Sequence, residues 1–306
     1  MSVCQDYQQF RMFMVIKNQP DRSGWRWTVV AIGMICVSLG IGSFVVYAIA
    51  GFHQVRTGSN WPAYRLVVLS IFINTVAAWV CLKFVFKHIE RRPLLTLVAC
   101  DGTLRIGRVF CGAMFWLVSF ATMLLVLACK TKLQTDVWPD MYARPHWPGT
   151  GNVILLVLFI LTLIFAAGQE EMIIRGWWAQ KIERHTKNRA ITAIIICVIF
   201  AIGHGYTSLP ISAGFALMSL GLSTLIAYEG RLELAMGAHA MHNVFLFVLY
   251  FTVARRDTGF HEGAGLLNKP VTWDDVVVVG GTYLLMLLLL HGMRRFQKRA
   301  MPPLPG

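Results

Sequence analysis

The stretch of sequence that decides the fold is residues 165–180, which read FAAGQEEMIIRGWWAQ. It lies at the end of an apolar run that begins near Asn152, and it places Glu170, Glu171 and Arg175 close together. A charged side chain at membrane depth costs at least ~2.5 kcal/mol on the insertion scale. Three such charges within six residues therefore indicate a function. The alternative is that they form the solvated end of a helix.

The composition is that of an integral membrane protein. Of the 306 residues, 56% are hydrophobic and 14% are charged, whereas soluble domains carry ~25% charged residues. The formal net charge of +13 can also indicate nucleic-acid binding. A membrane is favoured over nucleic acid because the basic residues are sorted by loop.

The apolar runs predict an all-α fold, a polytopic membrane helical bundle of about eight transmembrane helices, because a bilayer requires each span to satisfy its own backbone groups. The predicted spans are residues 27–51, 64–86, 107–129, 152–178, 190–206, 211–228, 234–254 and 273–293. The fourth span is expected to continue as a helix to His185. The chain then divides into a cytoplasmic tail (1–26), three leading helices with a loop (27–150), a core (151–254) and a last helix with a basic tail (255–306).

The distribution of basic residues predicts the orientation. Lys and Arg number 19 in the two tails and the loops of one side, and 8 on the other side. Because basic loops stay in the cytoplasm, we expect a multi-pass protein of the cell membrane with both termini cytoplasmic.

Buried ionisable residues gather in the fourth, fifth and seventh predicted spans. Glu170 and His204 each lie 17 residues from residue 187, the tip of the hairpin between two of these spans. Each is therefore ~25 Å along a helix from the tip. His239 lies eight residues past Arg231. If the spans are neighbours, we expect these three side chains to converge on the cytoplasmic side.

The spacing within the helices adds detail. Glu171 and Arg175 are four residues apart, which suits an ion pair on one helix face, and Glu170 is left free to act on a proton. His239 and Asn243 are also four apart, and both can donate hydrogen bonds to a developing oxyanion. His242 is interpreted as a packed histidine.

Three short motifs in this order resemble the CPBP family of intramembrane proteases, which joins the type II CAAX prenyl endopeptidases and the Abi (bacteriocin-processing and self-immunity) proteins. The motifs are E-E-x-x-x-R, F-x-x-x-H and H-x-x-x-N, and they stand here as Glu170, Glu171 and Arg175, then Phe200 and His204, then His239 and Asn243. The resemblance covers roughly residues 150–250.

The resemblance implies an intramembrane endopeptidase that cleaves a membrane-associated protein or peptide. It implies that Glu170 and His204 activate the hydrolytic water, that His239 and Asn243 hold the oxyanion, and that Glu171, Arg175 and Phe200 support them. No cofactor is implied with certainty. The residue types Glu170, His204 and His239 can bind a divalent metal such as zinc, which leaves a metalloprotease open.

Two other classes of function remain open from the sequence. A non-catalytic immunity or scaffold protein of the same fold would tolerate substitution of the motif residues. A transporter would use its buried Glu and His side chains to relay protons, but paired repeats and helix-breaking prolines within the spans, typical of transporters, are not evident in the sequence.

Overall fold

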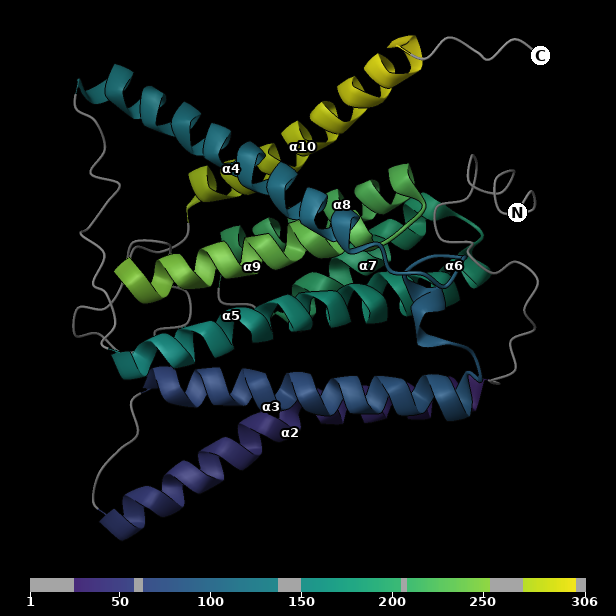
Figure 1. Cartoon of the computed structure of the whole chain (residues 1–306), viewed down its shortest axis with the longest axis vertical. Coiled ribbons are helices and arrows are strands. Elements are labelled where there is room, and N and C mark those ends of the chain that lie inside the picture. Colours follow the sequence, from purple (N-terminus) through teal and green to yellow (C-terminus); the bar gives the residue numbers. More distant parts are fainter. Residues whose placement is uncertain (1–24, 58–62, 137–149, 205–207, 254–271, 301–306) are drawn as a thin grey trace.

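The computed structural model describes residues 25–57, 63–136, 150–204, 208–253 and 272–300, which form helices joined by turns, with no β-strand in these ranges (Figure 1). The all-α class is therefore confirmed. The α-helices are α2 (Trp25–Thr57), α3 (Ala63–Phe84), α4 (Ile106–Thr135), α5 (Thr150–Glu170), α6 (Ala179–Thr186), α7 (Arg189–Gly203), α8 (Leu209–Glu229), α9 (Glu233–Val253) and α10 (Trp273–Ala300). Three short elements complete the set, namely the π-helices η1 (Val85–Ile89) and η3 (Glu171–Trp178) and the 3-10 helix η2 (Leu94–Leu97).

The described residues confirm a polytopic bundle. Five helices in them are long and apolar enough to cross a membrane: Val68–Ile89, Ile106–Thr135, Leu156–Thr186, Leu209–Glu229 and Trp273–Arg295. The helix expected to reach His185 ends at Thr186. The count of eight spans, the orientation of the termini and the domain boundaries stay predictions, and most of the predicted tail 1–26 lies outside the described residues.

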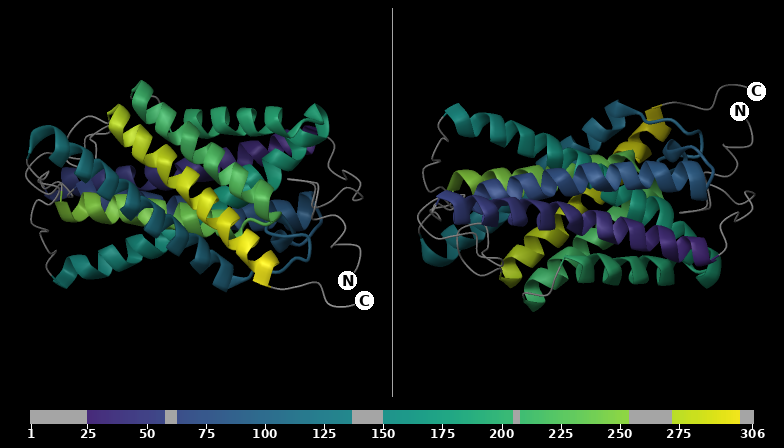
Figure 2. Two further views of the ribbon diagram at one scale, coloured as in Figure 1. Left: turned by 90° about the horizontal axis from the view of Figure 1, so that it is seen from above. Right: turned by 90° about the horizontal axis from the view of Figure 1, so that it is seen from below.

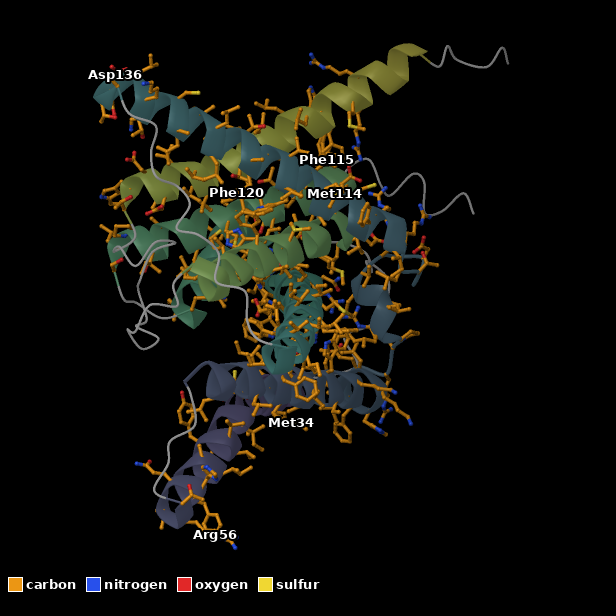
Figure 3. The ribbon with its side chains drawn as sticks, turned by 60° about the vertical axis from the view of Figure 1, so that its left-hand side comes forward. Met34, Arg56, Met114, Phe115, Phe120 and Asp136 are labelled. Carbon is orange, nitrogen blue, oxygen red and sulfur yellow. The ribbon has the colours of Figure 1, made fainter. Side chains whose placement is uncertain are left out.

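The helices pack in a sequence that differs from their order in the chain. Helix α2 packs on α3, α3 on α5, α5 on α9 and α9 on α4, while α10 contacts both α4 and α8. Figure 1 shows α2 and α3 on one side of α5, and α4 and α10 crossing on the opposite side. Figure 2 shows α10 running obliquely across the bundle. Arg56 lies at the end of α2 that points away from the other helices (Figure 3).

Two glycines allow α4 and α9 to cross closely. A Cβ atom at Gly112 of α4 would collide with the carbonyl group of Leu234, and a Cβ atom at Gly237 of α9 would collide with that of Val109. Small residues let helix backbones approach in a membrane, where lipid is as apolar as a leucine side chain and packing drives association. The crossing fixes the position of α9 along α4. It thereby also fixes the position of His239, which lies two residues after Gly237.

Helix α7 is shorter than the span predicted for it. It begins where Asn188 Oδ1 accepts hydrogen bonds from the amides of Ala190 (2.9 Å) and Ile191 (3.2 Å), which caps the helix. It ends at Gly203 with His204 as the C-cap residue, not at residue 206 as predicted. A helix of 15 residues is ~22 Å long, less than the ~30 Å hydrocarbon core of a bilayer.

An ion cluster holds the turn before α4 against the start of α9. Arg231 contacts Asp101 (2.7 Å) and Glu233 (2.6 Å), and the Leu232 amide donates to the carbonyl of Val98 (3.0 Å). Burial raises the pKa of the Asp101 carboxyl, but hydrogen bonds from Arg231 and Thr103 outweigh burial and hold that pKa well below its usual range. Asp101 therefore stays ionised at neutral pH, and the cluster ties α9 to the loop at its amino end.

We predict that Gly237→Ala destabilises the protein because the added methyl group forces α4 and α9 apart. The expected loss is about 1–3 kcal/mol, as for other overpacked sites, measured as a lower Tm in detergent. Gly51→Ala on α2 is the matched control, since a Cβ atom there meets nothing within 4 Å. Equal Tm values for the two variants would show that the crossing does not depend on Gly237.

Candidate active site

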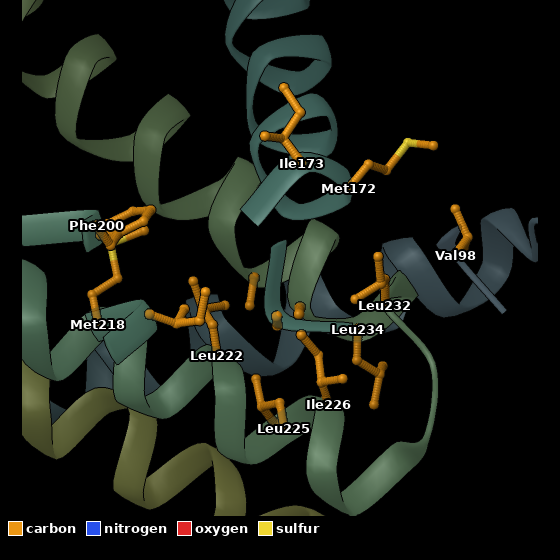
Figure 4. Packing of buried hydrophobic residues seen from close by; sticks show 14 of the residues in the cluster. Val98, Met172, Ile173, Phe200, Met218, Leu222, Leu225, Ile226, Leu232 and Leu234 are labelled. Atoms are coloured by element: carbon orange, nitrogen blue, oxygen red, sulfur yellow. The ribbon is translucent and has the colours of Figure 1, made fainter. Parts of the chain in front are cut away.

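A π-helix carries the first motif. Residues Glu171–Trp178 follow α5 without a break, and the amide of Ala179 donates to the carbonyl of Ile174, five residues earlier. π-Helical turns hold one more residue than α-helical turns and are frequent at functional sites. Met172 and Ile173 of this segment belong to the same buried hydrophobic cluster as Leu222 and Ile226 of α8 (Figure 4). The packing therefore fixes the segment that bears the charged residues.

Glu171 and Arg175 form an ion pair inside the protein. Arg175 Nη1 donates to Glu171 Oε1 at 2.6 Å, and both side chains are fully buried. The other end of the guanidinium, Nη2, donates to the Ser219 hydroxyl (2.8 Å) and carbonyl (3.3 Å) on α8. The guanidinium also lies over the ring of Phe200, 5.0 Å from its centroid. The prediction that Glu171 and Arg175 pair is confirmed, and the pair joins η3 to α7 and α8.

His239 lies between the two glutamates of the motif. Its Nδ1 atom is 2.8 Å from Glu171 Oε1, and its Nε2 atom is 3.6 Å from Glu170 Oε2. A carboxylate can only accept a hydrogen bond, so Nδ1 carries the hydrogen toward an ionised Glu171. The imidazole is thereby held in one orientation, with Nε2 directed at Glu170.

His204 approaches Glu170 from the end of α7. Its Nε2 atom is 4.0 Å from Glu170 Oε2, and its Nδ1 atom is 2.8 Å from the carbonyl oxygen of Phe200. Because a carbonyl accepts only, Nδ1 again carries the hydrogen. The ring is held between Phe200 (centroids 4.3 Å apart) and Phe215 (4.4 Å, stacked). Both histidines thus direct Nε2 at the same oxygen of Glu170.

The distances around Glu170 suit a shared water molecule. Separations of 3.6 and 4.0 Å exceed those of direct hydrogen bonds, and polar contacts beyond ~3.5 Å commonly have a water between the partners. Glu170 and His204 are each 30% exposed, whereas His239 is 1% exposed. The accessible side of the site is therefore formed by Glu170 and His204.

Glu170, His204 and His239 are brought together, as the spacing argument predicted, and Glu171, Arg175 and Phe200 lie beside them. Asn243 lies one helical turn beyond His239 on α9 and is half-buried. Within the described residues, the hydrogen bonds of the site do not include Asn243. Its place beside the site follows from helix periodicity alone.

The predicted metal site stays a prediction. Among the described residues there is no group of three or more His, Cys, Asp or Glu side chains placed to hold a metal ion. We therefore derive no step through a metal.

Sequence reasoning missed several residues of the site. Ser219, which holds Arg175, had a signal: Ser219 and Ser223 are polar residues four apart in an apolar span. Phe215, which stacks on His204, gave no signal, since aromatic residues are common in spans. Trp177 anchors η3 by donating a hydrogen bond to Glu90 Oε1 (2.9 Å), just after the π-helix η1. Sequence spacing could not predict this contact, because the two residues are 87 positions apart.

Comparison with known proteins agrees with the class of protein that the fold and site define, a polytopic membrane protein with buried Glu and His side chains. Residues 152–245 match the model of the type II CAAX prenyl endopeptidase Rce1-like family. The family resemblance predicted from the three motifs is confirmed over this segment, which contains all of them. Residues outside it are not covered by the match.

One curated relative is the uncharacterized protein YyaK of Bacillus subtilis (strain 168), which is 22% identical over 174 residues. The aligned region covers 55% of this chain and 54% of the relative. The chain thus spans about half the length of the curated relative it matches. No solved structure matches the chain.

We predict that Arg175→Met destabilises the protein by about 3–5 kcal/mol, because it leaves the Glu171 carboxylate buried without its cation. Lys130→Met is the control: its ion pair with Asp274 is about half exposed, and such pairs contribute roughly 0–1 kcal/mol. Thermal unfolding in detergent measures both. Adding Glu171→Leu to Arg175→Met should recover part of the lost stability, and no recovery would contradict a charge-based origin of the loss.

Proposed function

We propose that the protein is a CAAX-protease-like intramembrane endopeptidase that hydrolyses a peptide bond through a water molecule held by Glu170 and His204, with His239 and Asn243 as donors to the oxyanion. The observation that supports this best is the convergence of both imidazole Nε2 atoms on one oxygen of Glu170, at 3.6 and 4.0 Å. The match of residues 152–245 to the Rce1-like family supports the same class of reaction.

The hydrogen-bond geometry constrains where protons lie. With Nδ1 hydrogens directed at Glu171 and at the Phe200 carbonyl, neutral His239 and His204 would both offer lone pairs to the space beside Glu170. A carboxylate oxygen and two lone pairs are three acceptors, and one water can donate to two of them. We infer that His239 carries a second proton. The charges of Glu170, Glu171, Arg175 and His239 then sum to zero, as burial favours.

This protonation state assigns a role to each side chain of the site. The water donates to Glu170 Oε2, a buried oxygen without another partner among the protein atoms, and to His204 Nε2, and Glu170 takes a proton as the water oxygen bonds to the substrate carbonyl carbon. His239 Nε2–H and the Asn243 carboxamide donate to the oxyanion that develops on the carbonyl oxygen. When the C–N bond breaks, the proton on Glu170 passes to the leaving amine. Glu171 and Arg175 position His239.

The proposed substrate is a membrane-associated protein or peptide, and the proposed location is the cell membrane with both termini cytoplasmic. Glu170 and His204 lie on the accessible side of the site, which suits a substrate that enters beside α7.

We predict that Glu170→Gln and His204→Ala each abolish cleavage while leaving the fold intact, since both side chains are partly exposed and neither is in the buried ion pair. Asn243→Ala should lower the rate by about 10²–10³-fold, as loss of an oxyanion donor does. The measurement compares peptide termini in membranes that hold the wild type or a variant. Thr224→Ala is the control, because Thr224 is a half-buried α8 residue whose hydroxyl donates to the Leu220 carbonyl of the same helix.

Full cleavage by Glu170→Gln would reject the proposed function. If no wild-type-dependent termini are found, and a biological phenotype of the wild type survives in Glu170→Gln and His204→Ala, the protein acts as a membrane immunity or scaffold factor.

We also predict that chelators leave cleavage intact, because the proposed water is held by the Glu170 carboxylate and the His204 imidazole, and within the described residues no group of three His, Cys, Asp or Glu side chains is placed to hold a metal ion. The measurement is cleavage in membranes treated with 1,10-phenanthroline or EDTA, compared with untreated membranes. A loss that added zinc restores would show that a metal takes part.

A further inference from the structure

A second polar cluster lies in the bundle on the side of His239 away from Glu170. We define the inner polar cluster as Trp116, Ser119, Ser223, His242 and Tyr283, which come from α4, α8, α9 and α10. All five side chains are buried. The hydroxyls of Ser119 and Ser223 have no hydrogen-bond partner among the protein atoms, and the Tyr283 hydroxyl interacts with Trp116 without a hydrogen bond of normal geometry.

The members of this cluster are neighbours. The His242 ring lies edge-on to Trp116, with centroids 5.4 Å apart, and 6.4 Å from the ring of Tyr283. Tyr283 packs against α8 at Gly221, where a Cβ atom would collide with its ring. Ser223 lies on another face of α8, the one that carries Ser219, which contacts Arg175. Ser119 lies on α4 between Trp116 and Met123, whose side chain contacts α10 at Gly281.

The cluster borders the supporting pair of the proposed active site. The second oxygen of Glu171, Oε2, and the Nε atom of Arg175 are also buried and without a partner. Tyr283 interacts electrostatically with Glu171 and Arg175, and His242 with His239 and His204. Ser223 follows Ser219, the partner of Arg175, by four residues on α8, so both lie on one helix face.

An unpartnered buried group costs about 1–3 kcal/mol, and more when it is charged. Several such atoms gathered in one region would be expensive if the region were dry. Buried waters in proteins typically make about three hydrogen bonds to groups of this kind. The indole N–H of Trp116 and the Nε–H of Arg175 are donors, Glu171 Oε2 is an acceptor, and the hydroxyls can be either. Water suits such a mixed set because it also donates and accepts.

We propose that the inner polar cluster is an internal hydration site, in which ordered water molecules bridge Trp116, Ser119, Ser223, His242 and Tyr283 to Glu171 Oε2 and Arg175 Nε. The waters complete the hydrogen bonds of Glu171, whose other oxygen already holds Arg175 and His239. They thereby help to position His239. The site rests on geometry and burial, so its test does not depend on the proposed protease function.

Removal of single hydroxyls distinguishes a hydrated cluster from a dry one. In a dry cluster, Ser223→Ala, Ser119→Ala and Tyr283→Phe each remove an unsatisfied polar atom, and Tm should stay the same or rise. In a hydrated cluster each removes a partner of a bound water, and Tm should fall by roughly 2–4 °C. The double variant Ser223→Ala/Tyr283→Phe should fall by less than the sum of its single variants, because the two hydroxyls share one network.

Ser70→Ala is the matched control, since Ser70 is a buried serine with an unpartnered hydroxyl on α3, outside the cluster. It corrects for the small loss of packing that any Ser→Ala change brings. Lower Tm values in all three variants relative to this control, with a non-additive double variant, support the proposal. Unchanged or higher Tm values overturn it, and so do losses that add without coupling.

Discussion

The contact on which the site depends is the buried ion pair between Glu171 and Arg175. Neither charge can be left alone inside a bilayer-spanning bundle, so the pair must be complete. Arg175 also donates from Nη2 to Ser219 of α8, and Glu171 Oε1, which accepts from Arg175, also contacts His239 of α9. A pair within one helical segment therefore joins three helices that come together only in the folded chain.

The sequence was sufficient to predict this pair and the convergence of Glu170, His204 and His239, because both follow from distances along helices. Spacing of four residues identifies a helix face, and equal distances from a hairpin tip identify equal heights. The contact between Glu171 and His239 could not be predicted in the same way. It depends on how far η3 and α9 rotate toward each other, which is set by packing between residues 68 positions apart.

The fold was predicted well where composition decides it and poorly where local backbone geometry does. Apolar runs identified the helices, but helix boundaries moved at functional positions. Helix α7 stops at Gly203, and α5 changes to a π-helix at Glu171. Both changes place polar or charged groups where a regular α-helix would lie in an apolar environment. The close crossing at Gly112 and Gly237 also has no signature in composition, because glycines in open positions along α2 have the same local sequence character.

The change from α-helix to π-helix explains how two adjacent glutamates reach one imidazole. In a regular α-helix, neighbouring side chains diverge by about 100°, so Glu170 and Glu171 would address different helices. A π-helical turn holds an extra residue, which narrows that divergence. Glu171 can then lie fully buried against Nδ1 of His239, while Glu170, 30% exposed, faces Nε2 of the same ring. One carboxylate is thus confined to positioning, and the other is left accessible to water, by a local change of helix type at the junction between them.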